Sequence, residues 1–161
     1  MFEQYNDDAP ASAAEDTTEL RQKLSSGANW FYWIAGLSVI NSIANFFEAN
    51  WNFAVGLGIT QFFDGLGIYL RSEGSGQMIS AGLLSASIVV AGMFFLLGVF
   101  ANRQVLTAFV FGIVVYFFDA LLMLIFSDFL GIIIHVIALI FIIRGFLAAR
   151  QLRKSVLVPS I

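Results

Sequence analysis

Asp64, Asp119 and His135 are ionisable side chains that lie deep inside long apolar stretches of this sequence. Asp119 stands eight residues before Ser127, and His135 stands eight residues after it. If the chain turns at Ser127, the carboxylate and the imidazole lie at the same depth, about 12 Å from the turn. An imidazole and a carboxylate in contact can hold two helices together, or they can pass a proton, because imidazole titrates near neutral pH. Both interpretations stay open at this stage.

A second polar group follows two adjacent segments at helical spacing. Ser38, Asn41, Asn45 and Glu48 share one face of a helix, and so do Gly56, Thr60, Asp64, Gly67 and Arg71. A hairpin centred near residue 50 would place Asn41 opposite Ile59 or Thr60, so that the two faces meet. Small and amide side chains at such positions let membrane helices approach and form hydrogen bonds. The alternative is a hydrated or ion-binding cleft, because an aspartate inside a membrane must face protein or water.

Other kinds of chemistry are poorly represented. The chain has no cysteine and one histidine, so a thiolate site or a multi-histidine zinc site within one chain is excluded. The sequence lacks the metalloprotease, nucleophile-elbow and phosphate-loop motifs, and a Ser127–His135 nucleophile pair would be separated in depth by about 12 Å. His135 as a haem or chlorophyll ligand has no obvious second ligand. We expect no enzymatic activity and no cofactor or metal.

The composition indicates where these residues lie. Of 161 residues, 59% are hydrophobic and 12% are charged, against about a quarter charged in soluble domains. Eight Lys and Arg against eleven Asp and Glu provide no basic field for nucleic acid. Residues 1–26 are acidic and polar, which is unlike a secretory signal peptide. We therefore expect a disordered acidic tail over 1–26, a transmembrane helical domain over 27–150 and a short basic tail over 151–161.

Five apolar stretches approach the roughly 20 residues that a membrane helix needs. They cover 28–47, 51–70, 78–101, 105–126 and 129–150. The sequence thus predicts an all-α integral membrane protein, a helical bundle of four to five transmembrane helices whose neighbours are antiparallel. The stretch 51–70 is the doubtful one, because its four glycines, Gln61 and Asp64 would suit a broken or re-entrant helix.

The distribution of Lys and Arg decides the orientation weakly. With five spans the two sides carry nearly equal numbers, and Arg144, which can snorkel toward the C-terminal end, favours a cytoplasmic C-terminus. With four spans both termini fall on one side, and the bias becomes clear. Arg21, Lys23, Arg150, Arg153 and Lys154 would then all be cytoplasmic. A dual-topology protein is a third possibility, and the bacterial plasma (inner) membrane is the location we expect.

An internal repeat is suggested by two similar segments. Phe62-Phe63-Asp64-Gly65-Leu66 recurs 55 residues later as Phe117-Phe118-Asp119-Ala120-Leu121, and Ile34-Ala35-Gly36-Leu37 is echoed by Val90-Ala91-Gly92-Met93. Two related helix hairpins plus a C-terminal helix would result, in the manner of parallel transporter repeats. Coincidence in a phenylalanine-rich chain is the alternative.

Small residues also follow one face of each of two predicted helices, at positions Gly131, His135, Ala138, Ile142, Gly145 and Ala149 of the last and Ala81, Ser85 and Gly92 of the third. Such faces favour close packing, within the monomer or between copies. We therefore expect a non-enzymatic accessory or oligomerising subunit, whose partners are the lipid bilayer and a further copy or another membrane protein. The alternative is a small proton- or cation-coupled transporter or channel. Its candidate sites are Asp64, Asp119, His135, Asn41, Asn45 and Arg144.

Overall fold

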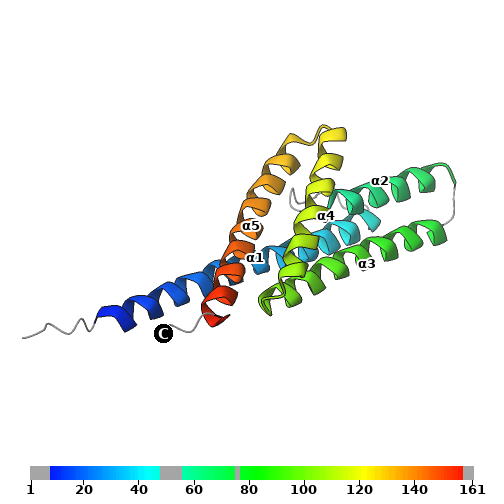
Figure 1. Ribbon diagram of the computed structural model, residues 1–161. Helices are drawn as coiled ribbons and strands as arrows, with labels where there is room; N and C mark the ends of the chain where they lie inside the picture. The colour runs from blue at the N-terminus through cyan, green and yellow to red at the C-terminus, as the bar shows by residue number, and fades with distance from the viewer. Residues whose placement is uncertain (1–7, 48–55, 75–76, 158–161) are drawn as a thin grey trace, which may run out of the picture.

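The computed structural model describes residues 8–47, 56–74 and 77–157, with side chains over 15–47, 56–74 and 77–155. These residues form five α-helices and no strand, which confirms the all-α prediction (Figure 1). The helices are α1 (Asp8–Phe46), α2 (Gly58–Ser72), α3 (Gln77–Asn102), α4 (Leu106–Ile125) and α5 (Phe129–Leu157).

Three of the helices in the described part are long and apolar enough to cross a membrane. They are α3, α4 and the part of α5 that ends at Ser155. Their bounds agree with three of the five predicted stretches. The predicted total of four to five spans is not confirmed, because α1 and α2 do not reach the same standard. In α1 the amides Asn29, Asn41 and Asn45 lower the hydropathy of the apolar half.

Helix α2 differs most from the prediction. It begins at Gly58 and has 15 residues, so it is about 22 Å long, less than the roughly 30 Å of a bilayer core. Residues 51–55 of the predicted span lie outside the described part. The predicted antiparallel hairpin with α1 is wrong, because Ser38 of α1 contacts Leu57 while Phe46, further along α1, contacts Arg71.

Helices α1 and α2 therefore run in the same direction, and both end at the same end of the bundle. The physical reason is the length of the connection. From Phe46 to Gly58 the chain can span about 40 Å when extended, more than the length of α2, so nothing forces a tight hairpin.

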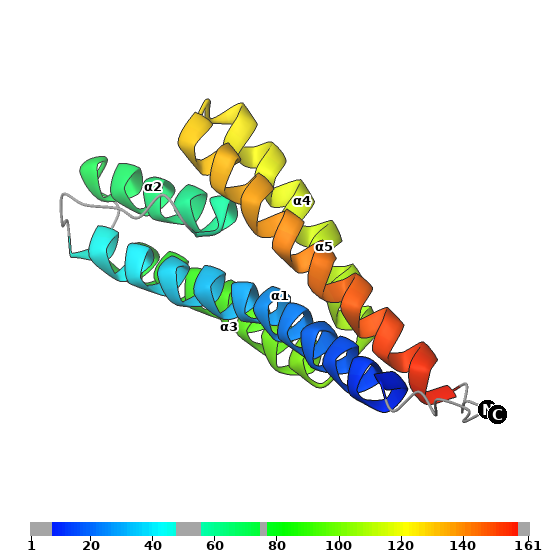
Figure 2. The same cartoon turned by 90° about the vertical axis from the view of Figure 1, so that its left-hand side faces the viewer.

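The helices form two pairs that diverge from one another. Helix α3 lies along α1 and helix α5 lies along α4, and the two pairs meet where α1 packs on the C-terminal half of α5, near Gly27 and Gly145 (Figure 2). We call this the terminal end, and the opposite end, with the α2–α3 connection and the α4–α5 turn, the loop end. Helix α2 fills the space between the pairs at the loop end. At the crossing of α1 and α5, a Cβ on Gly27 would lie 2.7 Å from the Gly145 Cα.

The small-residue face predicted for the last helix is buried inside this monomer. All six of its positions are buried against neighbouring helices. The face predicted for the third helix behaves differently: Ser85 and Gly92 are exposed, and Ala81 is half-buried. The buried face of α3 instead contains Ser80, Ser87, Ala91, Phe94, Gly98 and Ala101.

Helix α1 begins at Asp8, so most of the segment that we expected to be disordered belongs to this helix. Two contacts explain why the helix extends toward the N-terminus from residue 26. Leu24 is buried in the core and Leu20 packs against it, while Lys23 and Glu19 form an ion pair of 2.5 Å one helical turn apart. Likewise α5 continues past residue 150 to Leu157, with Leu152 buried.

Candidate functional site

The N-terminus of α2 contacts a carboxylate of α4. The Gly58 N–H donates to Asp119 Oδ2 at 2.7 Å, and the Ile59 N–H donates to Asp119 Oδ1 at 3.0 Å. The first N–H groups of any helix lack partners within the helix, and the helix dipole makes this end positive. Leu57 at the N-cap offers no side-chain acceptor. Asp119, which is only 4% exposed, therefore takes the place of the missing cap from another helix.

His135 of α5 completes this group. Its Nε2 lies 3.0 Å from Asp119 Oδ2, so the predicted contact across the α4–α5 turn is present. Its Nδ1 lies 2.7 Å from the Gly131 carbonyl oxygen, which can only accept, so Nδ1 carries a hydrogen and donates it. A further proton must then lie between Nε2 and Oδ2, since two lone pairs would repel. The pair therefore holds one shared proton, either on the imidazole or on the carboxyl.

A cluster of four aromatic side chains packs next to His135, on the side of the terminal end. The Tyr116 ring stacks on the imidazole with centroids 4.4 Å apart, and Phe94 meets Tyr116 edge-on at 6.0 Å. Phe31 lies between Phe94 and Phe109, with centroid distances of 6.3 and 6.1 Å. All four rings are buried. The Tyr116 hydroxyl is also buried and has no hydrogen-bond partner among the described residues.

Asp64 lies near the middle of α2 and joins three helices. Ser42 Oγ and Asn45 Nδ2 of α1 donate to Asp64 Oδ2 at 2.8 and 3.4 Å, and Ser87 Oγ of α3 donates to Oδ1 at 3.2 Å. The carboxylate is 8% exposed. A cavity of about 10 Å³ lies beside it, with Ser80 and Arg71 also in its wall. That volume suits about one water molecule.

Arg71 lies between this group and the loop end. Its Nη1 donates to the Phe46 carbonyl at 3.0 Å and its Nη2 to the Asn45 carbonyl at 3.4 Å. The guanidinium also lies over the Phe46 ring, 5.4 Å from the ring centroid. A cation near the C-terminal carbonyls of α1 is favoured by the helix dipole. The contact holds the C-terminal ends of α1 and α2 together.

Polar side chains also lie between the two acids. Ser38 Oγ accepts the Leu57 N–H at 2.8 Å and donates to the Ile34 carbonyl at 2.8 Å. Thr60 Oγ1 donates to the Leu57 carbonyl at 2.8 Å, and Asn41 is buried on the same side of α1. A succession of polar groups therefore follows α2 from the half-buried Arg71 at the loop end to the buried Asp119 and His135.

The structure brings together five of the six candidate residues along α2. Asn41, Asn45 and Asp64 belong to the α1–α2 contact, and Asp119 and His135 lie at the start of α2. Arg144 lies apart from them, exposed on α5 toward the terminal end. Sequence reasoning missed Ser42, Ser87 and Tyr116. Ser42 could have been found from its spacing of four from Ser38 and three from Asn45, whereas the tertiary contacts of Ser87 and Tyr116 leave no local signal.

Among the described residues, no group of three or more His, Asp or Glu side chains is placed to hold a metal ion. Comparison of the chain with models of known protein families, with curated proteins and with solved structures finds no match. Any functional assignment therefore depends on the geometry above.

Proposed function

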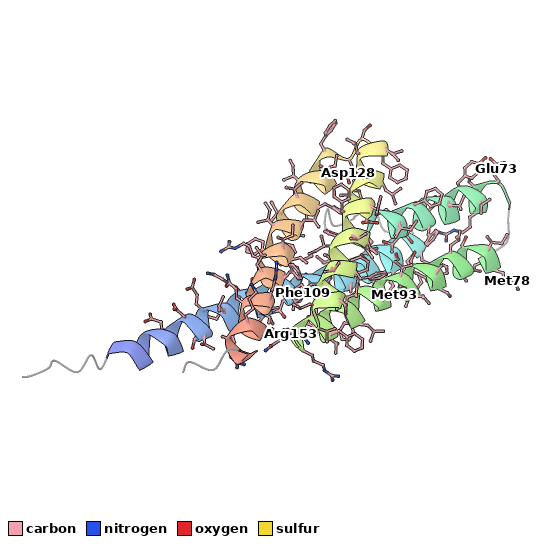
Figure 3. The ribbon with its side chains drawn as sticks, in the orientation of Figure 1. Glu73, Met78, Met93, Phe109, Asp128 and Arg153 are labelled. Carbon is pink, nitrogen blue, oxygen red and sulfur yellow. The ribbon has the colours of Figure 1, made fainter. Side chains whose placement is uncertain are left out.

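We propose that this protein is a multi-pass membrane protein with four spans, formed by the apolar half of α1 and by α3, α4 and α5, and with α2 as a re-entrant half-helix. Support comes from the path of α2, which begins beside Asp119 and ends at the loop end next to Phe46. The turn at Asp128 then lies at the same end as the α2–α3 connection, while Arg153 lies at the opposite end of α5 (Figure 3).

The charges support one orientation of this arrangement. Six of the eight Lys and Arg residues belong to the terminal end, namely Arg21, Lys23, Arg103, Arg150, Arg153 and Lys154. Arg71 belongs to the loop end, and Arg144 lies nearer the terminal end. Cytoplasmic segments carry the excess of Lys and Arg, so the terminal end faces the cytoplasm of a bacterial plasma membrane.

Within this membrane the protein acts as a small proton- or cation-coupled transporter or channel. The observation that carries this proposal is the pair of buried acids that contact one half-helix, Asp64 within α2 and Asp119 of α4 at the start of α2, with His135 Nε2 3.0 Å from Asp119 Oδ2. Ionisable side chains inside a membrane are costly and mark ion or proton paths. Discontinuous helices that end inside the bilayer provide such sites in transporters.

The proposed path leads from the loop end to His135 and is blocked beyond that residue. From the loop end, a proton reaches Asp64 beside its small cavity and continues past Thr60 and Ser38 to Asp119 and His135. The aromatic cluster around Phe31 and Tyr116 then separates His135 from the cytoplasmic side. Passage therefore requires a second arrangement of the bundle, and α2 is the element that can change position, because the carboxylate that holds its N-terminus also contacts His135.

The test uses the full chain in liposomes that contain a pH-sensitive dye, with a pH gradient and, separately, with sodium or potassium gradients. We expect flux from the unmodified protein and its loss in Asp64→Asn and in Asp119→Asn. Asp128→Asn is the matched control, because Asp128 also accepts a helix N-terminal N–H, from Gly131 at 2.9 Å, but at the loop-end turn. The yield of folded protein by size exclusion is measured for every variant.

No flux from the unmodified protein under any gradient would refute transport. Flux that survives both substitutions would remove the two carboxylates from the path. An equal loss of flux in Asp128→Asn would show that any change of a capping carboxylate damages the bundle. The assignment of Asp64 and Asp119 to the transport path would then be refuted.

A second candidate is association with another copy or another membrane protein, and the exposed face of α3 favours it. A Cβ added at Gly82 or Gly92 would meet nothing within 4 Å, and Ser85 between them is exposed. Small residues on an exposed membrane face allow a second helix to approach closely. Cross-linking in native membranes should then recover a dimer that Gly92→Leu removes, and recovery of monomer alone would refute association.

A further inference from the structure

A long groove runs along α1 beside α5 at the terminal end. It consists of a cavity of about 620 Å³ along α1 and an adjoining cavity of about 200 Å³, and the two share Gln22 and Ser26. The second cavity adds Lys23 from α1 and Phe141 and Arg144 from α5. Gly27 and Gly145, which follow the lining residues Ser26 and Arg144 in the sequence, bring the backbones of α1 and α5 close together at this end of the groove.

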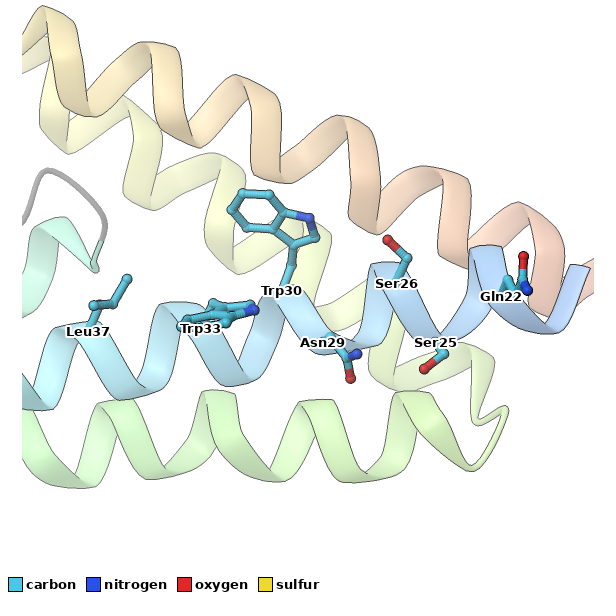
Figure 4. Close-up of a pocket in the computed structure, with 7 residues that line it drawn as sticks. All are labelled: Gln22, Ser25, Ser26, Asn29, Trp30, Trp33 and Leu37. Carbon is cyan, nitrogen blue, oxygen red and sulfur yellow. The ribbon is translucent and has the colours of Figure 1, made fainter. Parts of the chain in front are cut away.

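The lining of the groove changes from polar to apolar along its length (Figure 4). The part nearest the start of α1 carries Gln22, Ser25, Ser26 and Asn29, and the part toward the middle of α1 carries Trp30, Trp33 and Leu37. From Gln22 to Leu37 the helix rises about 22 Å. That length equals one leaflet of a bilayer that is about 40–45 Å thick with its headgroups.

The polar end of the groove also has an available positive charge. Arg144 is exposed among the apolar residues of α5 and forms no ion pair or hydrogen bond with the described residues. Lys23, by contrast, is held by Glu19. The hydrogen bond from Lys23 is the main reason why the pKa of Glu19 lies below its ordinary value, with a smaller part from the charge of Arg144. Of the two cations that line the groove, Arg144 is therefore the one that no side chain in the described part holds by an ion pair or a hydrogen bond.

A cation at the edge of the hydrocarbon region is stabilised by an anionic headgroup, and basic pockets between membrane helices on the cytoplasmic side bind such lipids. We propose that the groove binds an anionic phospholipid of the cytoplasmic leaflet. Its phosphate contacts Arg144 with Gln22 and Ser26 as hydrogen-bonding neighbours, and one acyl chain lies along Trp33 and Leu37. The site is independent of proton transport and requires only the proposed orientation.

The chain provides its own reporter for this site, because two of its three tryptophans line the groove. In a Trp51→Phe background, Trp30 and Trp33 are the only sources of tryptophan fluorescence. The full chain is placed in phosphatidylcholine liposomes, and brominated phosphatidylglycerol or brominated phosphatidylcholine with the same acyl chains is added at equal mole fraction. Bromine quenches tryptophan on contact, so the ratio of quenching measures the preference for the anionic headgroup.

One basic residue near a membrane surface contributes about fivefold in lipid affinity. We therefore expect the background protein to prefer phosphatidylglycerol about fivefold. The control variant Arg103→Gln, which removes a charge at the same end of the bundle but outside the groove, should show the same preference. In Arg144→Gln the preference should fall to about one, while Arg144→Lys should keep most of it. Size exclusion and circular dichroism establish that each variant is folded.

Two results would overturn the proposal. The first is equal quenching by the two lipids in the background protein. The second is a loss of preference in Arg103→Gln that matches the loss in Arg144→Gln, since a general surface charge would then account for the binding.

Discussion

The contact between Asp119 and the start of α2 provides a direct test of what holds the half-helix in place. With the shared proton on His135, Asp119 is a carboxylate, and Asp119→Asn keeps its size but removes that charge and replaces one acceptor oxygen with an NH₂ donor. The Gly58 and Ile59 N–H groups each use one carboxylate oxygen, at 2.7 and 3.0 Å. In the variant one of these N–H groups must face another donor, whichever way the amide is turned.

The size of the effect follows from these bonds. A hydrogen bond to a charged group contributes about 1.5–3 kcal/mol, and the interaction of the charge with the helix dipole adds about 0.3–1 kcal/mol. We expect the first turn of α2 to be destabilised by about 2–4 kcal/mol. At the lower value its opening equilibrium rises about thirtyfold, since 1.4 kcal/mol corresponds to a factor of ten.

The assay uses the absence of cysteine from the chain. Thr60→Cys places a single thiol in the first turn of α2 at a position that is 1% exposed, and its rate of reaction with a membrane-permeant maleimide reports how often that turn opens. Adding Asp119→Asn should raise the rate at least tenfold, whereas adding Asp128→Asn should not. A rate that Asp119→Asn changes by less than twofold would refute the anchoring role.

Three further predictions concern packing. Gly27→Ala should lower the thermal unfolding temperature in detergent sharply, because its Cβ would lie 2.7 Å from the Gly145 backbone, while Gly36→Ala, with nothing within 4 Å, should have almost no effect. Phe31→Ala should cost about 3–5 kcal/mol in unfolding experiments, because it leaves a cavity at the centre of the aromatic cluster. Tyr116→Phe should leave unfolding unchanged or raise its free energy, because the buried hydroxyl that it removes makes no hydrogen bond with any described residue; a loss above about 1 kcal/mol would contradict this.

Hydropathy and length were sufficient to predict α3 and α4 almost to their ends and α5 from its first residue, although α5 continues past residue 150 to Leu157. These helices are continuous apolar runs, and a run of that length must satisfy its backbone groups within one helix. The contact of Asp119 with His135 was predictable for a related reason. The α4–α5 turn at Ser127 and Asp128 is short, so equal distances from it place two residues at equal depth.

The direction of α2 was not predictable in the same way. A hairpin centred near residue 50 was expected after α1, but α2 begins only at Gly58. The direction depends on what holds the first turn of α2, and that partner, Asp119, comes 61 residues later in the chain. Glycine content indicated a broken helix, but no local pattern identifies a cap that another helix supplies.

The similar segments around Asp64 and Asp119 show what a local sequence pattern predicts and what it does not. Both place an aspartate on a buried helix face, and the internal repeat itself stays a prediction. Their partners are different in kind: Asp119 accepts fixed backbone N–H groups, whereas Asp64 accepts the hydroxyls of Ser42 and Ser87. A hydroxyl can rotate and accept from an amide, but a backbone N–H cannot.

Asp64→Asn should therefore cost less than about 1 kcal/mol of stability, against the 2–4 kcal/mol expected for Asp119→Asn, because the donors around Asp64 can reverse their hydrogen bonds. Thermal and denaturant unfolding of the two variants, measured side by side in one detergent, checks the difference. Equal destabilisation would mean that burial of the carboxylate, and not the identity of its donors, determines its contribution. Because Asp64→Asn keeps the fold by this reasoning, a loss of flux in that variant reports on the proton path and not on stability.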